Sequence, residues 1–105
     1  MSSRRGQIAV IGSGTADSYL QNLAFEVGSR IAKAGMVLLC GGRAGVMEAA
    51  AKGAQAANGM TIGVLPGKDE MASPPNRYID VALYTGMGQG RNQVLVLSAN
   101  AVIAV

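Results

Sequence analysis

The chain has 105 residues, a length that suits one domain. Half of the residues are apolar and 14% are charged, a composition that argues against intrinsic disorder. The net charge is +3, the basic residues are scattered and aromatic residues are few, so we expect no nucleic-acid partner. Histidine is absent and Cys40 is the single cysteine, which excludes histidine catalysis, an internal disulfide and the usual zinc sites.

The apolar stretches are too short for a membrane span or a secretion signal. The run after Arg4 and Arg5 covers only residues 8–11, and the longest stretch, residues 94–105, contains two polar residues. We therefore expect a cytoplasmic protein without a membrane partner.

Short apolar runs that end at glycine predict buried strands, and apolar residues at helical spacing predict helices. The expected elements are a strand at 7–11, a helix at 17–34, a strand at 36–40, a helix at 44–57, strands at 60–65 and 79–85, a helix at 91–99 and a strand at 101–105. Thr15 or Asp17 is the expected N-cap of the first helix, and Gly35 is expected to follow its end. Cys40 ends a buried strand, which favours a core thiol.

Strands that are apolar throughout, alternating with helices, predict a parallel sheet covered on both faces. We expect a single α/β domain over residues 1–105, with a Rossmann-like three-layer fold and about five strands in the order 3-2-1-4-5. Residues 1–6 are expected to be flexible, and the fold is expected to be truncated at its carboxyl end.

Three glycine-rich turns, at residues 12–14, 41–45 and 86–90, follow expected strands. Carboxyl ends of parallel strands share one rim, where backbone N–H groups and helix amino ends can bind phosphate. Arg91 begins a helix at this rim and is predicted to grip a phosphate bidentately. The candidate ligand-binding residues are Gly12, Ser13, Gly14, Gly41, Gly42, Gly45, Met47, Thr85, Gly86, Met87 and Arg91. We expect Gly42 to face the ligand, and we predict no metal site.

Each feature also has a structural explanation. Strand-to-helix turns need glycine in any case, and Arg43 suits a solvated loop. Glu48 is expected to interact with the positive end of its helix, with a catalytic role as the alternative. The first turn is no dinucleotide fingerprint, because Asp17 stands where the third glycine is required, and no phosphate-binding Lys-Ser/Thr pair follows any glycine.

Two segments, residues 41–54 and 59–67, resemble the Lonely Guy superfamily, whose members were long labelled "possible lysine decarboxylase". The turn at 12–14 and the segment 85–92, Thr-Gly-Met-Gly-Gln-Gly-Arg-Asn, fit as well. Together they look most similar to the bacterial branch that includes molybdenum-cofactor carrier proteins. The resemblance covers residues 6–105.

The resemblance implies a Rossmann-like homo-oligomer that binds a phosphorylated ligand, either a nucleotide of the AMP type or the molybdenum cofactor. In cytokinin-activating members, an arginine and a glutamate hydrolyse the N-glycosidic bond of a nucleoside 5′-monophosphate. Arg91 corresponds to that arginine, one residue further from Met87, and would be the catalytic residue. Lysine decarboxylation is implausible, because nothing marks a Schiff-base lysine.

The family's final glycine-rich segment, with its acidic residue, would begin where this chain stops at Val105. The chain is therefore expected to be either a fragment or a shortened member. This departure favours ligand binding without competent catalysis. The alternatives are a phosphoribohydrolase, a molybdenum-cofactor carrier and an interaction module that has lost its ligand. We expect self-association through the 91–99 helix and its sheet face, because one helix is too small to cover five apolar strands.

Overall fold

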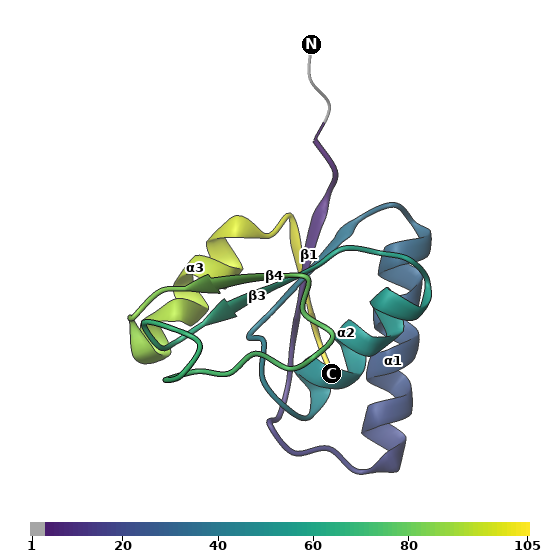
Figure 1. Cartoon of the computed structure of the whole chain (residues 1–105). Helices are drawn as coiled ribbons and strands as arrows, with labels where there is room; N and C mark the ends of the chain where they lie inside the picture. The colour runs from purple at the N-terminus through teal and green to yellow at the C-terminus, as the bar shows by residue number, and fades with distance from the viewer. Residues whose placement is uncertain (1–3) are drawn as a thin grey trace.

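A computed structural model describes residues 4–105. It shows a five-stranded parallel sheet with α1 and α2 together on one face and α3 on the other (Figure 1). The elements in chain order are β1 (Gln7–Ile11), α1 (Ser18–Lys33), β2 (Val37–Cys40), α2 (Val46–Ala56), β3 (Thr61–Leu65), β4 (Val81–Tyr84), a 3-10 turn η1 (Gly88–Gly90), α3 (Arg91–Ser98) and β5 (Ala101–Ala104).

The expected elements are all present, with ends that differ from the expected ones by no more than two residues. Asp17 is the N-cap of α1, since its carboxylate accepts a hydrogen bond of 2.9 Å from the Leu20 N–H. Gly35 follows the helix with φ of +77°, the left-handed conformation in which glycine carries no penalty. The N–H of Met36 then bonds back to the Ile31 carbonyl at 3.1 Å and closes the last turn.

The strand order is β4-β3-β2-β1-β5, and every pair is parallel. This confirms the Rossmann-like α/β class and the expected run of strands 3, 2 and 1 with a crossover to the far side of strand 1. The crossover strand is β5, however, whereas the order 3-2-1-4-5 assigned that place to the strand at 79–85.

Side-chain bonds at the start of β3 explain why β4 lies beside β3. The Asp80 carboxylate accepts from the Thr61 N–H at 2.9 Å, and the Thr61 hydroxyl donates to the Tyr78 carbonyl at 2.6 Å. The segment between β3 and β4 contains no helix, so it returns the chain to the neighbouring position. The helix that crosses the sheet is α3, which contacts β3 and β1 on its way to β5.

Two hydrophobic cores lie on opposite faces of the sheet. The larger one packs β1 and β2 against α1 and α2, and includes Val10, Leu38 and Val46. The smaller one surrounds Leu95 of α3, which packs against residues such as Leu39. The Cys40 side chain is fully buried, as the sequence predicted.

The helices α1 and α2 touch through their backbones. A Cβ on Gly28 would collide with the Ala50 carbonyl, and one on Gly53 would collide with the Phe25 carbonyl. The small residues of α2 therefore serve close packing on α1 as well as on the sheet. This approach fixes the relative position of the two helices' amino ends.

The amino end of the described chain already belongs to the sheet, because the Gly6 carbonyl accepts from the Val37 N–H at 2.8 Å. Residues 1–3 of the segment expected to be flexible lie outside the described residues. Within residues 4–105, no helix has the length and apolar character that a bilayer crossing needs.

Candidate functional site

A cavity of about 450 Å³ lies where β1 and β2 end and α3 begins; we call it the rim cavity. In a doubly wound sheet this is the crevice beside the crossover strand, where ligands bind. Its lining contains the predicted residues Gly12, Gly14, Gly41, Met47 and Arg91, together with Val10, Ile11, Gln89, Asn92, Leu95 and Val96. The other predicted residues, Ser13, Gly42, Gly45, Thr85, Gly86 and Met87, are not among the residues that line it.

Arg91 is held in a defined orientation by three hydrogen bonds. Its Nη1 donates to the Gly41 carbonyl at 2.7 Å and to the Val64 carbonyl at 2.8 Å. Its Nε donates to the Asn92 side-chain oxygen at 2.8 Å. A guanidinium has five N–H donors, so the two on Nη2 remain for a ligand. A ligand cannot use Nε and Nη2 together while Asn92 occupies Nε, so the bidentate grip predicted for Arg91 would have to use the two Nη2 donors.

The charge of Arg91 has no partner of opposite sign. Within residues 4–105 the guanidinium makes no ion pair, and no carboxylate lines the rim cavity. Burial lowers the pKa of Arg91, and the positive charge of Arg43 nearby lowers it further, against an opposing effect of Cys40. Arginine nevertheless stays protonated at neutral pH. The cavity therefore holds a partly desolvated positive charge, an arrangement that attracts anions.

Gly41 and Gly42 have different roles. A Cβ on Gly41 would lie 2.6 Å from the Met47 sulfur and 2.8 Å from Nη1 of Arg91, so only glycine leaves Arg91 its place. Gly42 has φ of +81°, and its Cβ would point at Leu65, 2.9 Å from the nearest methyl carbon. Gly42 therefore serves backbone conformation, and the expectation that it faces the ligand stays a prediction.

The first two glycine turns are locked together. The Val46 N–H donates to the Ser13 carbonyl at 3.0 Å, and a Cβ on Gly45 would collide with the peptide between Ser13 and Gly14. The Ser13 hydroxyl accepts from the Thr15 N–H at 3.1 Å, which stabilises the first turn. No side chain caps the amino end of α2, so the positive end of its dipole is left for other acceptors.

The third glycine turn is tied to the opposite loop. The Thr85 hydroxyl donates to the Leu65 carbonyl at 2.8 Å and accepts from the Met87 N–H at 3.2 Å. The Gly86 N–H donates to the Gly67 carbonyl at 2.9 Å. These bonds hold the turn beside β3, and Met87 is left 51% exposed. Only the end of this turn and the start of α3 reach the rim cavity.

Gln89 and Asn92 are site residues to which the sequence analysis assigned no role. The Asn92 amide donates to the Gln89 side-chain oxygen at 3.2 Å, while its own oxygen accepts from Arg91. Gln89 is thereby linked to the guanidinium through Asn92. Their spacing of three residues around Arg91, which places both on one side of a helical turn, was the available signal.

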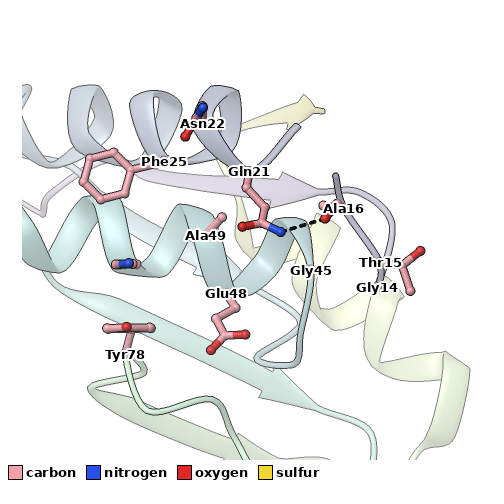
Figure 2. A pocket seen from close by; sticks show the side chains of 11 residues that line it. Gly14, Thr15, Ala16, Gln21, Asn22, Phe25, Gly45, Glu48, Ala49 and Tyr78 are labelled. Carbon is pink, nitrogen blue, oxygen red and sulfur yellow. Dashed lines mark hydrogen bonds between the residues drawn. The ribbon is translucent and has the colours of Figure 1, made fainter. Parts of the chain in front are cut away.

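A second cavity, of about 520 Å³, lies between the amino-terminal halves of α1 and α2; we call it the α1–α2 cavity (Figure 2). Figure 2 shows Gln21 and Phe25 on the α1 side, and Glu48 extending from α2 toward the side of Tyr78. The Gln21 amide donates to the Ala16 carbonyl at 2.7 Å. Gly14, in the first glycine turn, lines both cavities.

The single cysteine and the acidic residues within residues 4–105 bear on two other kinds of site, a reactive thiol and a metal site. Burial raises the pKa of the Cys40 thiol to about 11, so at neutral pH it is protonated and a poor nucleophile. Residues 4–105 contain no cluster of three or more acidic or cysteine side chains that could hold a metal ion.

Comparison with known proteins assigns the chain to a family. The model of the SLOG cluster4 family matches residues 5–105. An uncharacterized protein of Archaeoglobus fulgidus is 42% identical over 99 residues, which are 94% of this chain and 64% of that protein.

Two solved structures share the fold closely. The molybdenum cofactor binding protein of Rippkaea orientalis is 44% identical with a TM-score of 0.92, over 98% of this chain and 63% of that one. A Moco carrier protein of Chlamydomonas reinhardtii is 41% identical with a TM-score of 0.86, over 97% and 62%. The chain thus spans less than two thirds of the length of these relatives. It belongs to the SLOG cluster4 family, in the Lonely Guy-like superfamily and on its molybdenum-cofactor-carrier branch.

Proposed function

We propose that the chain binds a phosphorylated small molecule of the molybdenum-cofactor class in the rim cavity, and acts as a carrier rather than as a catalyst. The observation that carries this proposal is Arg91, whose guanidinium is fixed by three hydrogen bonds and keeps two N–H donors without a carboxylate partner in residues 4–105. The molybdenum cofactor is a pterin that carries a phosphate group. That phosphate matches the charge and the free donors of Arg91.

The names of the relatives support the identity of the ligand. The similar proteins of Rippkaea orientalis and Chlamydomonas reinhardtii are described as molybdenum cofactor binding and carrier proteins. Volume is compatible as well, because ligand cavities usually measure about 300–1,000 Å³ and the rim cavity measures about 450 Å³.

The absence of an acid in the rim cavity favours a carrier over a hydrolase. Cleavage of an N-glycosidic bond needs a group that donates or accepts a proton at the departing base, usually a carboxyl. In the described chain, the polar side chains that line the rim cavity are Gln89, Arg91 and Asn92. These groups can bind and orient an anion, but none of them is a general acid or base at neutral pH.

The test is retention of the cofactor. The wild-type chain and Arg91→Ala are each mixed with molybdenum cofactor under exclusion of oxygen and passed over a desalting column, and pterin and molybdenum are measured in the protein fraction. We expect the wild type to retain both, and Arg91→Ala to bind about 10- to 150-fold more weakly, since a hydrogen bond to a charged group contributes about 1.5–3 kcal/mol. Equal retention by the two proteins would refute a phosphate site at Arg91.

A further inference from the structure

The α1–α2 cavity differs from the rim cavity in charge. The rim cavity is lined by the cation Arg91 and by no anion of the described chain, whereas the α1–α2 cavity is lined by both Glu48 and Lys52. A phosphate would be attracted to the first cavity, whereas the carboxylate of Glu48 opposes an anion in the second. The two cavities therefore suit the two ends of a ligand that is charged at one end and neutral at the other.

Glu48 is a free acceptor within the α1–α2 cavity. Its side chain is half-buried, and within residues 4–105 its carboxylate makes no hydrogen bond and no ion pair with Lys52 one turn further along α2. A carboxylate has two oxygens that can accept two adjacent N–H donors side by side. A 2-amino-4-oxopyrimidine edge, which guanine and pterins share, presents such a pair of donors.

The walls of the cavity suit a flat ring. Two aromatic residues line the cavity: Figure 2 shows Phe25 on the α1 side of α2, and Tyr78 on the other side of α2, to which Glu48 extends. Ring faces stack on aromatic side chains with little dependence on the identity of the ring. Hydrogen bonds to Glu48 would then select rings that carry adjacent N–H donors.

Gly14 connects the two cavities. It lines both of them, and a Cβ built on it would have no atom within 4 Å. The space above this glycine is therefore open, and a ligand can pass over it from one cavity to the other. A side chain at this position would begin in open space, since its Cβ meets no neighbouring atom.

We infer that the α1–α2 cavity binds the heterocycle of the ligand whose phosphate lies at Arg91, with Glu48 as the residue that selects a 2-amino-4-oxopyrimidine edge. This inference rests on the proposed function, because it takes Arg91 as the phosphate end. It gives Glu48 and Gly14 roles in ligand binding, in addition to any role that they have in stabilising the fold. The structural explanation for Glu48 is its favourable place in the first turn of α2, beside the positive end of the helix dipole.

Calorimetric titration of the wild type, Glu48→Gln and Gly14→Leu with GMP and with inorganic phosphate tests the inference. GMP serves as the probe because guanine carries the required edge. Glu70→Gln is the matched control, since it removes the same charge from an exposed residue that lines neither cavity. The thermal midpoint of each variant shows whether it is folded.

We expect the wild type and Glu70→Gln to bind GMP at least tenfold more tightly than inorganic phosphate. In Glu48→Gln and Gly14→Leu, this advantage should shrink to threefold or less. In Glu48→Gln, whose side chain lies outside the rim cavity, the affinity for inorganic phosphate should stay unchanged. The inference is overturned if GMP has no advantage in the wild type, if Glu48→Gln keeps this advantage, or if Glu48→Gln loses affinity for phosphate and GMP equally. Should the wild type bind neither probe, the proposed function itself fails.

Discussion

The neighbouring glycines of the second turn should respond to alanine in opposite ways. At Gly41, the new Cβ would lie 2.6 Å from the Met47 sulfur and 2.8 Å from Nη1 of Arg91. Both of those atoms are at the ends of flexible side chains, so the protein can fold if they move. The bonds from Nη1 to the Gly41 and Val64 carbonyls, of 2.7 and 2.8 Å, are then the contacts that weaken.

The magnitude for Gly41→Ala follows from those contacts. Overpacking of a core position costs about 1–3 kcal/mol, and we expect the low end of this range because the displaced atoms are mobile. Loss of the fixed guanidinium should lower the affinity for inorganic phosphate about tenfold, which corresponds to roughly 1.4 kcal/mol.

Gly42→Ala is the matched comparison. Its φ of +81° strains any residue with a Cβ, and that Cβ would press on Leu65. A left-handed conformation at a residue other than glycine costs about 1–3 kcal/mol, so urea denaturation should show a clear loss of stability. The folded fraction should bind phosphate as the wild type does. A folded Gly41→Ala with wild-type affinity, or a folded Gly42→Ala without affinity, would refute the assignment of the two glycines.

Three further predictions concern Arg91, Cys40 and the surface of α3. Asn92→Ala should weaken phosphate binding a few-fold, because it releases Nε of Arg91. Asn92→Asp should weaken it more, because a carboxylate there would neutralise the guanidinium. Calorimetry in which Asn92→Asp binds phosphate more tightly than Asn92→Ala would contradict this role of Asn92. Burial raises the pKa of the Cys40 thiol from 9.0 to about 11. Between pH 9 and pH 11 the folded protein keeps the thiol proton while the unfolded chain loses it, so the free energy of unfolding falls as the pH rises through this range. Urea unfolding should show that the free energy of unfolding of the wild type falls by roughly 2–3 kcal/mol over this range, and that this fall is missing in Cys40→Ala. The same pH dependence in both proteins would contradict the prediction. Finally, Leu97 is 77% exposed and Val96 is 46% exposed, so we propose that copies associate through α3 and its sheet face. Sedimentation equilibrium should then show more than one chain per particle in the wild type and less association in Leu97→Asp, whereas a clean monomer would rule this out.

The elements of the fold were predictable because each strand is a short apolar run, and glycine lies within two residues of the end of β1, β2, β3 and β4. Local signals also narrowed the N-cap to Thr15 or Asp17, of which Asp17 is the one observed, and identified the left-handed Gly35, since both positions act on the nearest turn of helix. The order of the strands in the sheet was harder to predict from the sequence. The position of β4 depends on bonds that join Asp80 and Tyr78 to Thr61, which lie far apart in the sequence.

The site was predictable to the level of the rim and not of the individual atom. Glycine turns and Arg91 follow strands, and parallel strands end together, so their meeting was foreseeable. Whether Gly41 or Gly42 lies beside Arg91 depends on backbone dihedral angles, which could not be predicted from the amino-acid sequence. The hydroxyl of Thr85 likewise seemed free in the sequence, but the Leu65 carbonyl occupies it.

The central claim is that the two free N–H groups of Arg91 bind the phosphate of the ligand. The most direct measurement is a thermodynamic cycle in which GMP and guanosine are each titrated into the wild type and into Arg91→Ala. We predict that removal of the phosphate and removal of the guanidinium are coupled, so that GMP loses at least tenfold in affinity on mutation while guanosine loses little. Equal losses for the two compounds, or equal affinities of GMP and guanosine for the wild type, would contradict the claim.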